Sequence, residues 1–237
     1  MLTAEQISEL SQRYQTSRVN ILREYLQHLF LSYFYQQKGS ENFLFKGGTA
    51  LRIIYNSPRF SEDLDFSGLR DGVIYEKIIE RVLDLVSKTG DIKVDLAESK
   101  KTSGGWIGVF LFRILENKIR IVNEISYRDK EKEGSFALVS SNFVPPYRVF
   151  TLEPRILVEE KINALITRKK SRDIFDLYFI LRDTRLRKFY SPKKKELILN
   201  FIRDAKGSDI ERDLGDFLPL SYKPLLKELV DKILDEL

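Results

Sequence analysis

One stretch, FLFKGGTALRIIYNSPRFSEDLDF (residues 43–66), constrains the fold of this chain more than any other. An apolar run leads into Gly47 and Gly48, and Asp63 and Asp65 later alternate with apolar residues. Adjacent glycines allow a tight turn and close backbone approach. Alternation on a strand places both carboxylates on one face and the apolar side chains on the other. The stretch therefore predicts a strand at 42–46, a glycine turn, a short helix at 49–56 and a strand at 62–67.

The same stretch predicts a site for phosphate and metal. Free amides at a helix N-terminus attract phosphate, and Thr49 can cap the helix or touch a phosphate oxygen. Two carboxylates on one strand face repel each other unless a cation joins them. Mg²⁺ (with Mn²⁺ as the alternative) accepts oxygen ligands and keeps positions for substrate phosphates. Lys46 and Arg59 border the turn and the acidic strand, so both are predicted to contact phosphate.

The remaining patterns predict an α+β fold in which a mixed sheet is flanked by helices. Residues 3–38 are expected to be helical, and helices return from residue 152 onwards. Pro145–Pro146 mark the expected boundary between a unit at 1–150 and a helical unit at 151–237. Between these parts we expect a helix at 75–88 and strands at 91–98, 106–115 and 118–126; the later helices are expected at 152–167, 172–183, 192–205 and 222–236.

Composition excludes several kinds of chemistry. The chain has no cysteine, which excludes disulfides, cysteine nucleophiles and thiolate zinc sites and fits a cytoplasmic protein. Its single histidine, His28, lies in a helical stretch and is expected to be structural. No apolar run is long enough to span a membrane, and the N-terminus does not resemble a signal peptide. Catalysis must therefore use carboxylates, lysines, arginines, backbone amides or a metal with oxygen ligands.

Charge is unevenly distributed along the chain. The segment 168–195 contains eleven Lys or Arg and three Asp, which gives +8, whereas the whole chain carries +5. Such a basic block predicts a polyanionic partner such as RNA. The alternative is an ordinary solvated helix face.

A second motif, EEKINALITRKKSRDIFDLYFI (residues 159–180), follows the predicted boundary. Lys161 can bind an NTP phosphate as a point charge, and Asp173 and Asp176 are spaced to share one helix face. Together the two motifs resemble the AbiEii/AbiGii toxin family of nucleotidyltransferases, within the polymerase-β-like superfamily. The resemblance extends from about residue 43 to 181.

The resemblance implies a polymerase-β-like core whose active site is completed by the helical C-terminal unit. It implies that Lys161, Asp173 and Asp176 are catalytic beside Asp63 and Asp65. Surface charges, or N-capping by Asp173, are the alternatives for the first three. Many superfamily members hold a third metal carboxylate on a neighbouring strand. Glu124 in IRIVNEISYR is our candidate, and Asp95 in IKVDL is its competitor.

The function that follows is metal-dependent transfer of a nucleoside monophosphate from NTP to an acceptor, with RNA such as tRNA as the expected acceptor. The resemblance further implies a toxin that acts opposite an antitoxin protein. Transfer to a protein hydroxyl is one alternative, and a non-catalytic module that binds RNA or a partner is another. A carboxylate-metal nuclease would use the same aspartates but would not need the glycine turn.

Overall fold

A seven-stranded mixed sheet with strand order β3-β4-β5-β2-β1-β7-β6 organises the N-terminal two thirds of the computed structural model. The structure describes residues 2–69, 72–128, 131–203 and 207–237. The strands are β1 (Phe43–Lys46), β2 (Leu64–Gly68), β3 (Lys93–Thr102), β4 (Gly105–Ile114), β5 (Asn117–Ser126), β6 (Gly134–Val139) and β7 (Tyr147–Leu152). The helices are α1 (Ala4–Arg13), α2 (Arg18–Phe34), α3 (Gly47–Tyr55), α4 (Gly72–Ser87), α5 (Pro154–Arg168), α6 (Ser171–Arg182), α7 (Lys195–Ile202), α8 (Gly207–Leu214) and α9 (Lys223–Glu236).

Parallel and antiparallel pairings are combined in this sheet. Strand β2 runs parallel to β5, and β1 runs parallel to β7, whereas the other pairs are antiparallel. The expected α+β class with a mixed sheet is therefore confirmed. None of the helices in the described ranges is long and apolar enough to cross a membrane.

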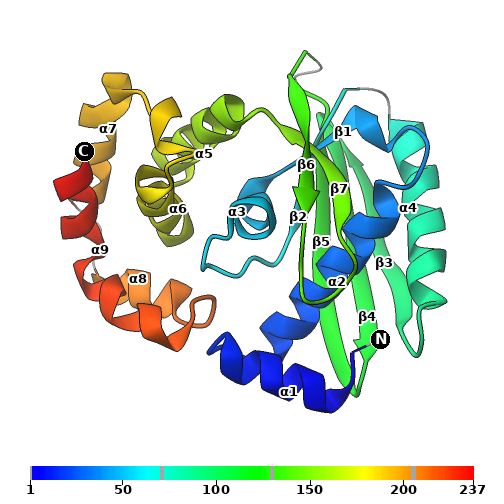
Figure 1. The fold of residues 1–237 in the computed structure, drawn as a ribbon. Coiled ribbons are helices and arrows are strands. Elements are labelled where there is room, and N and C mark those ends of the chain that lie inside the picture. The colour runs from blue at the N-terminus through cyan, green and yellow to red at the C-terminus, as the bar shows by residue number, and fades with distance from the viewer. Residues whose placement is uncertain (1, 70–71, 129–130, 204–206) are drawn as a thin grey trace.

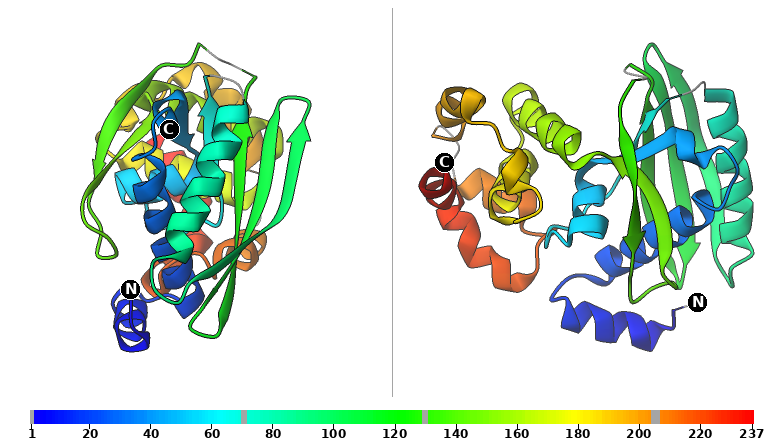
Figure 2. Two further views of the ribbon diagram at one scale, coloured as in Figure 1. Left: turned by 90° about the vertical axis from the view of Figure 1, so that its right-hand side faces the viewer. Right: turned by 45° about the horizontal axis from the view of Figure 1, so that its top comes forward.

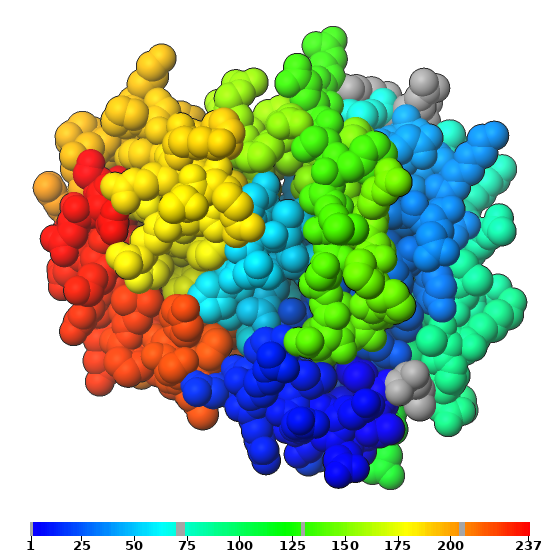
Figure 3. Space-filling model, viewed as in Figure 1, coloured from blue at the N-terminus to red at the C-terminus, as the bar shows by residue number. Residues whose placement is uncertain are grey.

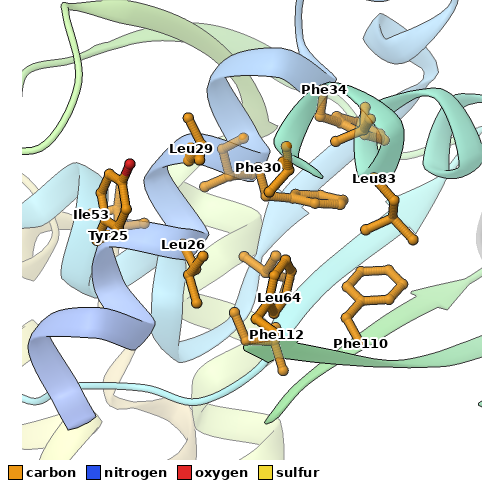
Figure 4. Packing of buried hydrophobic residues seen from close by; sticks show 14 of the residues in the cluster. Tyr25, Leu26, Leu29, Phe30, Phe34, Ile53, Leu64, Leu83, Phe110 and Phe112 are labelled. Atoms are coloured by element: carbon orange, nitrogen blue, oxygen red, sulfur yellow. The ribbon is translucent and has the colours of Figure 1, made fainter. Parts of the chain in front are cut away.

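One face of the sheet is covered by α2 and α4, while α5 to α9 gather on the opposite side (Figures 1 and 2). The apolar residues of α2 pack onto those of the sheet, as Phe30, Phe110 and Phe112 show in Figure 4. Helix α2 begins where the Ser17 side chain accepts a hydrogen bond from the Asn20 amide. His28 is buried within this core, where its Nδ1 lies 2.8 Å from the Tyr147 hydroxyl. Burial lowers the pKa of His28 to about 3, so the ring is neutral and structural.

A second apolar core lies among the C-terminal helices, and α3 lies between the two cores (Figure 1). Ala50 and Ile53 of α3 belong to the core of the sheet, whereas Leu51 and Tyr55 belong to the helical core. Residues of α3 are visible between the C-terminal helices and β6–β7 in Figure 3. The helix that starts at the glycine turn is thus packed from both sides.

Several element boundaries differ from expectation. The N-terminal helix is interrupted, because Gln15 has a φ of 52° and Ser17 caps a new helix. Residue 150, where we expected the first unit to end, lies inside β7, which pairs with β1. Helix α8 was not predicted at all. The last two residues of the helix expected at 192–205 lie outside the described ranges.

Candidate active site

Three charged side chains form a row across one face of the sheet. In the register of the strands, Lys46 of β1 is paired with Asp65 of β2, and Asp65 is paired with Glu124 of β5. Side chains of directly paired residues lie on the same face of a sheet. Asn123 and Leu64, one residue earlier on their strands, are buried on the opposite face. The register thus directs the row towards the C-terminal helices.

Asp63 stands one residue before β2 and lines the same cleft as Asp65 and Glu124. Burial, reinforced by the neighbouring Asp65 carboxylate, raises the pKa of Asp63 to about 6. Burial also raises the pKa of Asp65, against the opposing effect of Lys161. Glu124 has a raised pKa through burial and then through Asp65. Ionisation of each carboxylate is therefore less favourable in the cleft than in water.

The glycine turn packs directly against this acidic row. Gly47 has a φ of 83°, a conformation that favours glycine, and a Cβ there would collide with the Asp65 carboxylate. A Cβ on Gly48 would collide with the Arg59 guanidinium and approach Ser61 Oγ to 2.9 Å. Thr49 is fully buried, and its hydroxyl donates a hydrogen bond to the Asp63 carbonyl. The turn therefore joins directly to the segment that carries the aspartates.

A buried ion cluster connects the C-terminal helices to the same segment. Asp176 accepts hydrogen bonds from Lys161 Nζ at 2.7 Å and from Arg59 Nε at 2.9 Å. Although burial alone would raise the pKa of Asp176, Arg59 and Lys161 hold it below its ordinary value. Asp176 is 1% exposed and stays ionised between two cations. It fixes the position of Lys161, which does line the cleft.

Another carboxylate, Glu160, bridges two lysines at the edge of the cleft. Its oxygens lie 3.1 Å from Lys46 Nζ and 2.6 Å from Lys132 Nζ. Burial would raise the pKa of Glu160, but Lys46 and Lys132 lower it. Lys46 is therefore held by Glu160 as well as being paired in register with Asp65.

All these groups surround one cleft of about 640 Å³ between the sheet and the helices α5 and α6. Its lining contains five acidic residues and seven basic residues. The acids are Asp63, Asp65, Glu124, Glu160 and Asp173, and the bases are Lys46, Arg59, Arg128, Lys161, Arg168, Lys170 and Arg172. Most of the acids come from the sheet, whereas most of the bases come from the C-terminal helices and their connection.

The model of one protein family, described as nucleotidyl transferase AbiEii toxin, type IV toxin–antitoxin system, matches residues 29–237. The chain belongs to this AbiEii family. It is therefore a nucleotidyltransferase toxin of a type IV toxin–antitoxin system, and membership implies a nucleotide substrate and an antitoxin partner. The match begins within α2 and includes both motifs. A comparison with curated proteins gives no match.

Two solved structures share the fold of this AbiEii chain. A candidate nucleotidyltransferase from H. pylori is 19% identical, with a TM-score of 0.61 over 93% of this chain and 96% of the other. JHP933 from Helicobacter pylori is 20% identical, with a TM-score of 0.61 over 93% and 94% of the two chains. The similarity extends over nearly the whole length, C-terminal helices included.

The structure brings together most of the residues that we predicted for the AbiEii site. Asp173 lines the cleft, and its Oδ2 is buried without a hydrogen-bond partner. Thr49 and Asp176 do not line the cleft, since both are bonded inside the protein. Arg172 of α6 lies 4.0 Å from Asp63. Of the two candidates for a third carboxylate, Glu124 lies in the row, whereas Asp95 pairs with Arg113 on an exposed part of the sheet.

The basic block divides into two parts in space. Its first part supplies Arg168, Lys170 and Arg172 to the cleft. Its second part starts at Arg182 and contributes no residue to the cleft lining. Several of these later cations are already bonded, including Arg182 and Arg187 to Glu236. Only the first part of the block at 168–195 therefore contributes to the lining of the cleft.

Sequence reasoning missed Glu160, Lys132 and Arg128. Glu160 precedes Lys161 directly, but nothing in the sequence shows that it would meet lysines from β1 and from the segment before β6. Arg128 follows β5 and enters the cleft only because β5 lies beside β2. These contacts come from tertiary structure, and no local pattern predicts them.

Proposed function

We propose that this chain transfers a nucleoside monophosphate from NTP to a 3′-hydroxyl of RNA such as tRNA, with Mg²⁺ as the metal. The observation that carries the proposal is the row of Lys46, Asp65 and Glu124, which faces the Gly47–Gly48 turn and Lys161 in one cleft. Carboxylates, an amide-rich turn and cations are the groups that nucleotidyl transfer requires.

The carboxylates fit a hard divalent cation. Asp63, Asp65 and Glu124 offer only oxygen ligands. Burial raises the pKa of all three, and the Asp65 carboxylate raises the pKa of Asp63 and of Glu124 further. In the described residues no three acidic or histidine side chains already have the geometry of a metal site. We therefore infer that Asp63 and Asp65 hold the ion and that Glu124 and substrate oxygens complete its shell; Mn²⁺ has the same ligand preference.

Such a cation, when bound, neutralises charge on the transferring phosphate and supports an in-line displacement. The residues of the chain have separate tasks in this proposal. Amides at the Gly47–Gly48 turn and the ammonium of Lys161 bind the β- and γ-phosphates, which leave as pyrophosphate. Asp176 positions Lys161 and is itself bonded to Arg59, which packs against the wall of the turn and lines the cleft.

Asp173 has a distinct role in the proposal. This residue lines a cleft rich in cations and carboxylates, and a buried oxygen without a partner is unfavourable until a polar contact satisfies it. We propose that it accepts a hydrogen bond from a substrate hydroxyl or amino group. The alternative, helix capping, has no support, because α6 has no side-chain cap.

RNA is the proposed acceptor because Arg128, Arg168, Lys170 and Arg172 bring positive charge to the open cleft. NTP and RNA occur together in the cytoplasm, where we propose that the protein acts against its host until an antitoxin opposes it. No feature of the described residues favours a protein acceptor, a nuclease or a module without catalysis over this reading.

The test is incubation of the full chain with each α-labelled NTP, Mg²⁺ and total RNA. We expect label in RNA with at least one NTP, and none in the presence of EDTA. Label in protein alone would show that the acceptor is a protein and not RNA. Shortened RNA without label would indicate a nuclease. Absence of label with every NTP, for a folded protein, would contradict the proposed transfer.

A further inference from the structure

A second pocket, the side pocket, opens beside the cleft. It has a volume of about 600 Å³ and lies between the segment before β2 and helices α6 to α8. Arg59, Ser61, Lys170 and Arg172 line both this side pocket and the cleft. The two spaces are therefore adjacent, with these four residues between them.

Apolar side chains form the floor of the side pocket. They are Phe60, Ile174, Phe201, Ile210, Leu214 and Phe217. Four of them are at most 2% exposed, whereas Phe201 and Phe217 are only partly buried and present aromatic surface. The walls are tied together, since the Phe60 amide donates to the Phe217 carbonyl at 2.7 Å. The pocket is thus preformed and suits a flat ring.

Polar groups surround this floor. Asp213 accepts a hydrogen bond from Ser171 Oγ at 2.7 Å, and Asp209 pairs with Arg212 at 3.0 Å. Lys169 Nζ lies 5.8 Å from the centroid of the Phe201 ring. Carboxylates and a guanidinium held at the edge of an apolar floor can accept from, and donate to, the edge of a nucleobase or the hydroxyls of a ribose.

The position of the side pocket relative to the cleft indicates which substrate it binds, the donor NTP or the acceptor. In an in-line displacement the attacking hydroxyl and the leaving pyrophosphate lie on opposite sides of the α-phosphate. Glu124, Trp106 and Arg128 line only the cleft, at the end where β4 and β5 meet it. Arg59 and Ser61 pack against Gly48, so the side pocket adjoins the phosphate turn instead. The β4–β5 end is left for the acceptor.

We infer that the side pocket binds the nucleoside part of the donor NTP: the base packs on Phe201 and Phe217, and Asp213 reads its edge. This inference rests on the proposed function, because it assigns the triphosphate to the cleft. It places the selection among ATP, GTP, CTP and UTP in α6 to α8, away from the acidic row.

The test compares each NTP with inorganic tripolyphosphate, which has the phosphates but no nucleoside. Binding to the full chain is measured by calorimetry for wild type, for Phe201→Ala with Phe217→Ala, and for Phe136→Ala. Phe136 is the matched control, since it is an aromatic residue on β6 with 61% exposure. The double variant should bind the preferred NTP about tenfold more weakly, from lost stacking. Its tripolyphosphate affinity should change by less than about twofold, and so should both affinities of the control.

A conservative variant keeps the test informative if the double variant is unstable. Asp213→Asn preserves the shape of the side chain but replaces one carboxylate oxygen, an acceptor, by an NH2 group, a donor. The order of affinities for the four NTPs should therefore change, while the affinity for tripolyphosphate stays the same. Equal losses for NTP and tripolyphosphate in both variants, or weakened RNA binding with normal NTP binding, would overturn the inference. If the wild type binds tripolyphosphate and transfers label, but the variants keep the NTP ranking of the wild type, only the assignment of the nucleoside to the side pocket is refuted. Absence of NTP binding by wild type would instead refute the proposed function.

Discussion

The two walls of the cleft are built by different means. On the sheet, Asp65 and Glu124 are adjacent because the register of β2 and β5 leaves them no other position. On the helices, Arg168 and Arg172 reach the cleft as long side chains on α5 and α6, and Arg172 stays partly exposed at 4.0 Å from Asp63. The sheet wall holds its carboxylates in fixed positions, where burial raises their pKa values. The helix wall carries its positive charge on long side chains that can change conformation. This difference is what supports the proposal of a small cation on the sheet and a polyanion on the helices.

The largest effect on transfer is expected when charge is removed from the sheet wall. Asp65→Asn should lower transfer by more than about 1,000-fold, because it removes an anionic ligand while leaving the fold intact. Asp95→Asn is the matched control, since that carboxylate pairs with Arg113 on an exposed face. Initial rates with labelled NTP measure both. Wild-type rates in Asp65→Asn and in Asp63→Asn would show that the acidic row is not the catalytic centre.

The glycine turn lies where the two walls meet, and a substitution there tests its part in NTP binding. Gly48→Ala should weaken NTP binding at least about tenfold, because its Cβ would displace Arg59 from the wall shared with Asp176. Gly207→Ala is the control, as Gly207 also begins a helix but its Cβ would meet only ordinary contacts of 3.7 Å or more. Calorimetric titration with NTP measures the difference. Equal affinities in two folded variants would move the phosphate site away from the turn.

The helix wall can be separated from the rest of the basic block with two triple variants of equal charge. Replacing Arg168, Lys170 and Arg172 by Gln should weaken RNA binding about 100-fold near 100 mM salt and lower the salt slope by about 2 to 3. Replacing Lys193, Lys194 and Lys195 should have a small effect, since Lys194 bonds Asn163 and Lys195 bonds the Leu237 carbonyl. RNA binding from about 50 to 200 mM salt gives both slopes. A larger loss in the second variant would place the acceptor on the outer surface.

The smallest expected effect is on stability, because an ionised, buried carboxylate on the sheet wall lowers the free energy of unfolding. Asp63 has a pKa of about 6 when folded and an ordinary value of 3.8, so its folded form holds a proton more tightly. Its ionisation therefore destabilises the fold above pH 6, partly so between these values, and not at all below 3.8. With EDTA present, Asp63→Asn should raise the free energy of unfolding by about 1 to 2 kcal/mol at pH 7.5, after allowance for solvent screening. Urea unfolding at pH 7.5 and pH 5 should show a gain that is smaller at pH 5; a loss of stability at pH 7.5 would contradict the raised pKa.

Much of the sheet wall was predictable from the sequence. The alternation of Asp63, Leu64 and Asp65 identified the strand and the direction of its acids, because a period of two is a local property. Glu124 was recognised only as a candidate, since the pairing of β5 with β2 is not visible in either strand alone. The turn at Gly47–Gly48 was expected to admit phosphate, whereas the structure adds that both glycines are also required by Asp65 and Arg59.

The helix wall was harder to predict. Charge counting found the block at 168–195 but could not divide it, because the direction of each side chain depends on packing between helices. Asp176 was predicted as catalytic from a motif, but its bonds to Lys161 and Arg59 depend on tertiary packing and could not be predicted from that motif. Helix α8, which lines the side pocket, is short and polar and has too weak a pattern to be predicted.

The position of α3 between the two cores has a consequence for how the protein opens. Its Ile53 is packed in one core and its Leu51 in the other, so loss of either core removes support from the helix that carries the phosphate turn. Local fluctuations on the surface can occur without exposing it, but its amides should exchange with deuterium only when at least one of the two cores opens. A fragment that lacks the C-terminal helices would therefore lose the support that the second core gives to the phosphate turn.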